Sequence, residues 1–326
     1  MVTYNHEKYI AQAIESVLMQ KASFDYELVI GEDFSTDKTR EIVIKYQKKH
    51  PNKIKLILNK KNLGMMPNFI QTLKTCKGEY VAMLEGDDYW IDPYKLQKQV
   101  DFLSRNPDYS ISSHNVYVTQ DGRKGQPIEW LGEYHRETST LEEILRDGSG
   151  GATCSLVFRN NIFGEFPKWF VGLPGGDWAL QIFCTIHGKM YYFNKVMSVY
   201  QRGHPNNALM VATRSVHRKG RETIGLSYEY TLNIINIFDK YFKYRYSNLL
   251  KNQVIYCYFN LANLYKQNKE FVKARHYAWR CLKEIFGQHP YLSLEHIINL
   301  IKIILLPNNI NINHLIKKKS TEQKSR

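Results

Sequence analysis

The sequence has few cysteines and lacks a long apolar run. The five cysteines among its 326 residues form no Cys-x-x-Cys pair. A scattered, odd-numbered set argues against a disulfide framework or a zinc knuckle and fits a reducing compartment. No stretch reaches the roughly 18 apolar residues that a spanning helix needs, and the first residues lack the apolar run of a signal peptide. We therefore expect a cytoplasmic protein.

The sequence also lacks a glycine-rich phosphate loop. No Gly-x-Gly-x-x-Gly follows a predicted strand, which argues against a dinucleotide-dependent oxidoreductase. After the first strand the chain reads Asn5-His6-Glu7-Lys8-Tyr9. This segment is not the Gly-rich, Arg/Lys-bearing loop usual in a sugar-nucleotide nucleotidyltransferase. That enzyme class remains an alternative, but a disfavoured one.

Charge is strongly unbalanced, with 45 Lys and Arg against 31 Asp and Glu, a net charge of +14. Such an excess suits nucleic acid, anionic lipid or phosphorylated substrates and does not choose among them. Much of it lies in surface-type lysines and in the C-terminal tail, whereas the acids gather in a few motifs. A non-enzymatic basic nucleic-acid binder does not account for those acids, so we expect no nucleic-acid partner.

The first part of the chain alternates strands and helices. Strands are predicted at residues 27–30, 53–58 and 79–84, with helices ending near Lys49, Thr75 and Ser104. This order predicts an α/β fold with a mostly parallel, mixed sheet flanked by helices. In such sheets ligands gather at the carboxyl ends of strands.

From about residue 215 the pattern becomes helical. Residues 256–264 and 272–282 predict two antiparallel helices that resemble one tetratricopeptide-like hairpin. Because repeat stability usually needs about three units, a plain helical extension is favoured over a helical-repeat adaptor. An apolar helix over residues 292–306 is too short to span a bilayer, so it either packs on the domain or lies in the membrane interface. The basic tail, 308–326, is predicted to be disordered, and its lysines favour an anionic membrane surface.

The central acidic motif is Glu85-Gly86-Asp87-Asp88, at the end of a predicted strand. Two carboxylates about 4 Å apart repel by about 4 kcal/mol at an effective dielectric of 20. A divalent cation relieves that repulsion, and Mn²⁺ or Mg²⁺ suits oxygen ligands. The alternative is a solvated turn whose acids cap the helix that follows Asp92-Pro93.

Two further carboxylates stand at comparable places. Asp33 follows the strand 27–30, where it could accept a hydrogen bond from a nucleobase N–H, while Ser35, Thr36 and Asp37 are predicted turn and cap residues. Asp177 follows Gly175-Gly176 and could take a proton from a substrate hydroxyl as a general base. It could also be a helix N-cap, and the two roles are compatible.

In their order along residues 1–210, these motifs resemble the family-two inverting glycosyltransferases, which have the nucleotide-sugar GT-A fold. The matching segments are Val2-Thr3-Tyr4-Asn5, residues 27–39, Asn62-Leu63-Gly64, Glu85 to Asp88, Asp177, and Tyr200-Gln201-Arg202-Gly203-His204. The resemblance divides the chain into a catalytic domain at 1–214, a helical extension at 215–307 and a basic tail at 308–326.

The resemblance implies a role for each matching residue. A Mn²⁺ or Mg²⁺ ion would be held by Asp88 and His204, and Asp177 would be the general base. Thr3, Tyr4 and Asp33 would hold the base and ribose of the donor, and Asp87 would face the ribose and sugar. Arg202 and His204 would contact the diphosphate. The whole donor-binding set is Thr3, Tyr4, Asn5, Glu7, Asp33, Asp87 and Arg202.

Three features depart from the family pattern. Glu85 replaces the usual first Asp, and Gly176 replaces the usual Glu before the base, so that a supporting contact is missing or moved. The chain also begins inside the first strand, since only Met1-Val2 precede Thr3. We expect that the start codon was assigned too late, and an in-frame apolar strand upstream would test this.

The resemblance further implies transfer of one sugar per encounter, with inversion. A processive synthase would need spanning helices and a Gln-x-x-Arg-Trp motif, and the sequence has neither. The expected partners are a nucleoside-diphosphate sugar, UDP-type favoured, and a glycan or lipid-linked acceptor. The expected setting is surface polysaccharide or lipopolysaccharide biosynthesis, peripherally on the inner face of the membrane.

Overall fold

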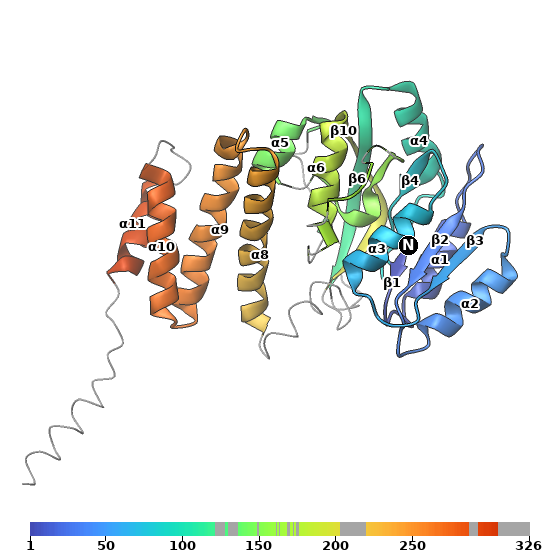
Figure 1. The fold of residues 1–326 in the computed structure, drawn as a ribbon, viewed down its shortest axis with the longest axis horizontal. Helices are drawn as coiled ribbons and strands as arrows, with labels where there is room; N and C mark the ends of the chain where they lie inside the picture. Colours follow the sequence, from blue (N-terminus) through green and yellow to red (C-terminus); the bar gives the residue numbers. More distant parts are fainter. Residues whose placement is uncertain are drawn as a thin grey trace, which may run out of the picture. The chain divides into compact units, whose positions relative to one another are not determined.

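The computed structural model describes residues 1–120, 128–129, 136–148, 150–160, 162, 164–167, 170–171, 173, 176–202, 220–286 and 293–305. The chain divides into two compact units, Met1–Arg218 and Lys219–Arg326 (Figure 1).

The first unit begins with a parallel sheet of three strands. The strands are β1 (Val2–Thr3), β2 (Leu28–Glu32) and β3 (Ile54–Leu58), in the order β1-β2-β3. Helices α1 (Ile10–Leu18) and α2 (Thr39–Lys49) connect them, and α3 (Met65–Thr75) leads onward. Every residue of β2 is buried, as expected for an apolar strand between two neighbours with covered faces.

A second sheet of seven strands holds the rest of the unit. Its main path is β4-β9-β6-β10-β5, with β7 on β6 and β8 on β10. Only β6 and β10 pair in parallel among these strands, and the other pairs are antiparallel. The strands are β4 (Tyr80–Ala82), β5 (Tyr89–Trp90), β6 (Tyr109–Gln120), β7 (Ile128–Glu129), β8 (Thr138–Ser139), β9 (Val157–Arg159) and β10 (Lys189–Arg202).

The predicted α/β class with a mixed sheet and flanking helices is therefore confirmed. Among the described residues of the first unit, the other helices are α4 (Lys95–Arg105), α5 (Leu141–Asp147) and α6 (Asp177–Ile186), with a short 3₁₀ turn at Thr153–Ser155. The predicted strand 79–84 pairs regularly only over Tyr80–Ala82. Beyond it, a single parallel bridge joins Val2 to Glu85, so that the acidic motif begins beside β1.

The second unit consists of helices α8 (Gly220–Tyr241), α9 (Ser247–Gln267), α10 (Phe271–Phe286) and α11 (Leu294–Ile304). Small residues let α9 and α10 approach, because Ala262, Ala274 and Ala278 are fully buried in their shared core. Helix α11 buries Leu300 and Ile303 in the same core but leaves Ile298, Ile301 and Leu305 exposed. Among the described residues, no helix is long and apolar enough to cross a membrane.

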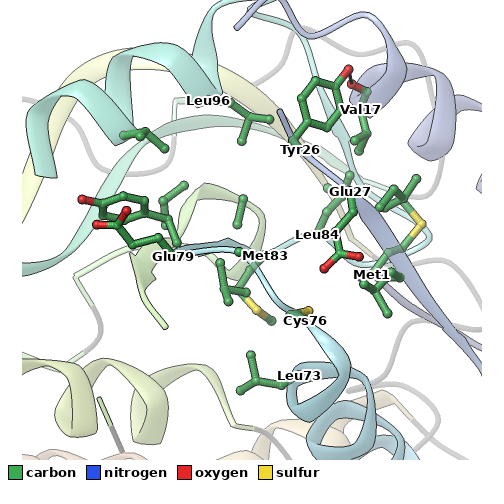
Figure 2. Close-up of a pocket in the computed structure, with 18 of the residues that line it drawn as sticks. Met1, Val17, Tyr26, Glu27, Leu73, Cys76, Glu79, Met83, Leu84 and Leu96 are labelled. Carbon is green, nitrogen blue, oxygen red and sulfur yellow. Dashed lines mark hydrogen bonds between the residues drawn. The ribbon is translucent and has the colours of Figure 1, made fainter. Parts of the chain in front are cut away.

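An apolar cavity of about 430 Å³ lies between β2 and β4 (Figure 2). Its walls include Tyr26, Leu73, Met83 and Leu96, and the N-terminus of the chain, Met1, lies at its edge. The terminal amine of Met1 donates to the carbonyl of Val29 at 2.8 Å, as a peptide N–H of a strand would. Burial lowers the pKa of this amine.

The strand edges on both sides of the cavity carry donors in regular alternation. Gly31 N–H and Asp33 N–H donate to the carbonyls of Met1 and Thr3, and Gly86 N–H donates to that of Val2. Because donors recur every second residue on one side of a strand, Val29 and Leu84 come next in these two rows, and both line the cavity. The space thus has the geometry of a further stretch of parallel strand ahead of Met1.

We therefore expect an apolar extension to stabilise the protein. Adding about five alternating apolar residues before Met1, at about 3.3 Å per residue, should fill the cavity and complete both rows of hydrogen bonds. At about 24 cal/mol per Å³ the gain is at most about 10 kcal/mol, less because the cavity is partly open to solvent. Melting temperature should rise by at least about 5 °C, and a Gly/Ser extension of equal length is the control. Equal melting of the two extended proteins would contradict this assignment.

Candidate active site

The loops that follow β1 and β2 are held together by side chains. Asn5 has a left-handed backbone, with φ of 56°, a conformation that Asn adopts more readily than most residues. Its N–H donates to Ser35 Oγ at 3.0 Å, and its Oδ1 accepts from Thr36 N–H at 2.8 Å. Ser35 and Thr36 therefore serve as turn residues, as predicted.

Glu7 contacts the start of α2. Its N–H donates to Asp37 Oδ2, and its Oε2 accepts from Lys38 N–H, both at 3.1 Å. Asp37 also accepts from the N–H of Thr39, the first residue of α2, at 2.9 Å, although Lys38 rather than Asp37 occupies the cap position. Tyr4 is half-buried in the same loop.

Asp33 is buried and heavily hydrogen-bonded. Its Oδ1 accepts from Asn59 Nδ2 at 2.9 Å and from Leu63 N–H at 2.8 Å, while its Oδ2 accepts from Gly64 N–H at 2.9 Å. Asp33 thus anchors the loop between β3 and α3, and Asn62 Nδ2 donates to its carbonyl at 3.2 Å. The structure brings the two sequence motifs that contain these residues into direct contact.

The acidic motif lies against the loop after β1. Gly86 must be a glycine here, because a Cβ atom would lie 2.5 Å from Thr3 Oγ1 and 2.9 Å from His6 Nδ1. The carboxylate of Asp87 lies close by, with Oδ1 3.9 Å from His6 Nδ1. Thr3, His6 and Asp87 are all buried.

Asp88 is 1 % exposed, and its two carboxylate oxygens differ in their hydrogen bonding. Its Oδ1 accepts from the N–H of Gln201 at 2.8 Å, whereas its buried Oδ2 has no hydrogen-bond partner among the described residues. Gln201 also donates through Nε2 to the carbonyl of Asp87, so one residue of β10 is hydrogen-bonded to both acidic residues. Burial, followed by the nearby carboxylates of Asp87 and Glu85, raises the pKa of Asp88 well above its usual range.

Glu85 shares this electrostatic environment. Burial, then the Asp87 and Asp177 carboxylates, raise its pKa to about 8. Asp177, far away in sequence, is therefore close enough to Glu85 to act on its ionisation. A region in which acidic groups raise one another's pKa values attracts a cation.

These residues fit a divalent cation. Asp88 offers a buried carboxylate oxygen that has no hydrogen-bond partner among the described residues, and Glu85 and Asp87 place further carboxyl groups near it. Within the described part of the chain, no group of three His, Cys, Asp or Glu side chains forms a closed metal site. Mg²⁺-type sites commonly use only one or two carboxylates and take their other ligands from water and substrate phosphates.

Asp177 is the first residue of α6, and Gly176 rather than Asp177 occupies the cap position. Its Oδ1 accepts from Trp178 N–H at 2.8 Å. The protein atoms packed around this carboxyl raise its pKa, although the residue remains exposed at its surface. The residue is therefore accessible from solvent.

Gly176, which departs from the family pattern, lies against the flexible end of Met66. A Cβ atom at this position would lie 2.9 Å from Met66 Cε and 3.1 Å from its sulfur, on α3. Met66 thus occupies the space in which a side chain at position 176 would start. Among the described residues, the hydrogen-bond partner of the Asp177 carboxylate comes from its own helix.

Two expected donor residues are only partly placed. Arg202 ends β10, one residue beyond Gln201, and its backbone alone is described. His204 lies outside the described residues, so its predicted role as a metal ligand stays a prediction.

Sequence reasoning missed four residues near the acids. His6 contacts Thr3 and Asp87, and Gln201 donates hydrogen bonds to Asp87 and Asp88. The pKa of Tyr9 is raised by burial and then by Asp87, and the Cys154 thiol lies close enough to Asp88 to act on its pKa. His6, Tyr9 and Gln201 lie inside quoted motifs, whereas the sequence around Cys154 gives no such signal.

Comparisons with known proteins follow the same motifs. Residues 1–164 match the family model described as "Glycosyl transferase family 2". An uncharacterized protein of Mycobacterium tuberculosis (strain H37Rv) is 32% identical over 206 residues, 62% of this chain and 57% of that protein. The putative teichuronic acid biosynthesis glycosyltransferase TuaG of Bacillus subtilis is 34% identical over 158 residues, 48% of this chain and 60% of its own.

A solved structure shares the fold. It is that of S. aureus TarS, residues 1–349, in complex with UDP-GlcNAc, with a TM-score of 0.51 and 19% sequence identity. The alignment covers 85% of this chain and 81% of that one. The chain spans 57% of the length of the mycobacterial relative.

Proposed function

Because the chain belongs to glycosyl transferase family 2, we propose that it transfers a single sugar from a nucleoside-diphosphate sugar to a hydroxyl of a glycan or lipid-linked acceptor, with inversion. One observation carries the proposal. The carboxyl groups of Asp87, which follows β4, and of Asp177, which begins α6, both raise the pKa of Glu85, and Asp87 and Glu85 in turn raise that of Asp88. The nucleotidyltransferase and the non-enzymatic binding module are the alternatives.

The donor lies across the ends of β1 and β2 in this proposal. Thr3, Tyr4 and Asp33 hold the base and ribose, and Asn5 and Glu7 belong to the same donor-binding set. Asp87 faces the ribose and sugar, and Arg202 contacts the diphosphate. The loops after β1 and β2 are joined by hydrogen bonds of Asn5 with Ser35 and Thr36, which supports a preformed site. A preformed site loses less conformational freedom when the donor binds.

Asp88 holds Mn²⁺ or Mg²⁺, with His204 as a second ligand. When bound, the cation neutralises charge on the diphosphate leaving group. The unpartnered Oδ2 of Asp88 supports this role. The Gln201 N–H on Oδ1 fixes the direction in which the other oxygen points.

Asp177 is the general base. It accepts the proton of the acceptor hydroxyl while that oxygen forms a bond to the anomeric carbon from the face opposite the diphosphate. The bond from the anomeric carbon to the diphosphate oxygen breaks, and its electron pair leaves with the nucleoside diphosphate. The configuration at the anomeric carbon therefore inverts.

The setting we propose is surface polysaccharide or lipopolysaccharide biosynthesis, at the inner face of the membrane. The similarity to a glycosyltransferase named for teichuronic acid biosynthesis supports it. The exposed Ile298 and Ile301 on α11 and Leu305 directly after it, followed by the basic segment 308–326, suit an anionic membrane surface.

A screen of nucleotide sugars tests the proposal. UDP-, dTDP- and GDP-linked sugars are incubated with the chain and a lipid-linked acceptor fraction, with Mn²⁺, Mg²⁺ or EDTA, and released nucleoside diphosphate is measured. We expect release with one donor class, UDP-type favoured, and loss of release in EDTA. No release with any donor, together with salt-sensitive DNA binding, would favour the non-enzymatic alternative.

A further inference from the structure

Phe34 has a backbone conformation that its side chain disfavours. Its φ is 61°, in the left-handed region, where bulky residues are rare because Cβ crowds the following carbonyl. Strained residues of this kind persist where the surroundings fix them and concentrate at ligand sites. Phe34 directly follows Asp33, at the carboxyl end of β2.

The side chain of Phe34 is exposed to solvent and lies against a cation. The residue is 45 % exposed, and the guanidinium of Arg40 lies 5.2 Å from the ring centroid. Arg40 is itself fixed, because it pairs with the fully buried carboxylate of Glu32 and donates to the carbonyl of Asn59 at 2.6 Å. A rigid cation therefore supports the exposed aromatic ring.

Asp33, the neighbour of Phe34, has little hydrogen-bonding capacity left. A carboxylate accepts about four hydrogen bonds, and Asp33 already accepts three, from Asn59, Leu63 and Gly64. Asp33 can therefore accept about one further hydrogen bond, from an N–H on the edge of a base. The rest of the contact with the base comes, in the proposed function, from Thr3 and Tyr4 and from any further group at this end of the sheet.

We propose that Phe34 stacks on the nucleobase of the donor, with the Arg40 guanidinium supporting the ring. This inference rests on the proposed function. Aromatic side chains stack on the face of any base, so the residue contributes affinity at a place where hydrogen bonds are few. The backbone strain persists because it presents the ring beside Asp33.

Two effects of opposite direction test the assignment. In Phe34→Asn the backbone strain is relieved, because Asn tolerates the left-handed region, and the melting temperature should rise. Loss of the ring should raise the Kd for UDP in the presence of Mn²⁺ about tenfold, measured by calorimetry. Phe34→Tyr keeps the ring and should bind UDP as the unmodified chain does.

Tyr94→Ala is the matched control. Tyr94 is 47 % exposed, lies near the amines of Lys21 and Lys98, and has an ordinary φ of −111°. We expect this variant to bind UDP normally. Unchanged UDP binding by Phe34→Asn, an equal loss in Phe34→Tyr, or a lower melting temperature of Phe34→Asn would overturn the proposal. If the unmodified chain binds none of UDP, dTDP and GDP, the proposed function itself fails.

Discussion

Replacement of Asp177 by Asn should lower turnover by about 10³-fold, within the range that a general base contributes, and leave nucleotide binding unchanged. The amide has nearly the same shape as the carboxylate and can still accept from Trp178 N–H, so α6 should begin as before. What is lost is the ability to take a proton from the acceptor hydroxyl. The expected pattern is a fall in kcat with the Kd for UDP, measured with Mn²⁺, unchanged.

The control for this experiment is Asp108→Asn, the same chemical change at an exposed carboxylate. Asp108→Asn should have the turnover of the unmodified chain. Turnover of Asp177→Asn within about fivefold of the unmodified chain would remove Asp177 as the base. A parallel loss of UDP binding would instead assign the residue to the donor site.

The acidic motifs were predictable because strand ends are local features. The apolar run Leu28–Ile30 predicts a buried strand, and the chain leaves it at Asp33. In a parallel sheet such ends meet at one edge, which is why Asp33 and Asp87 could be assigned to the same edge of the fold. The contact of Asn62-Leu63-Gly64 with Asp33 needs the three-dimensional structure, since its donors include backbone N–H groups.

Long-range pairing was not predictable from local patterns. Residues 109–120 and 189–202 form the two longest strands, β6 and β10, and pair in parallel with several irregularities of register. Only this pairing, and that of β10 with β5, brings Gln201 to the Asp87-Asp88 turn. A glutamine at the end of a strand has no chemical signature of its own, so sequence reasoning emphasised Arg202 and His204.

The second large effect concerns Asp88→Asn. With Mn²⁺ present throughout and UDP at about 100 times its dissociation constant, UDP binding should stabilise the unmodified chain by about 2.7 kcal/mol, or roughly 5–10 °C in melting temperature. The variant should show almost none of this shift. Its amide keeps an acceptor for Gln201 N–H but cannot offer an anionic oxygen at the position of Oδ2, which has no partner among the described residues.

The same variant should behave oppositely without metal. Asp88 is buried beside Asp87 and Glu85, so its ionisation is disfavoured in the folded chain. A neutral amide there avoids the cost of protonating this carboxylate on folding, and the metal-free variant should melt at or above the temperature of the unmodified chain. Thermal melting with EDTA, with Mn²⁺, and with Mn²⁺ plus UDP measures both effects, and Asp108→Asn again is the control. If Mn²⁺ plus UDP stabilises the variant as strongly as the unmodified chain, the cation is held elsewhere. If the metal-free variant melts well below the metal-free unmodified chain, Asp88 serves the fold rather than the metal.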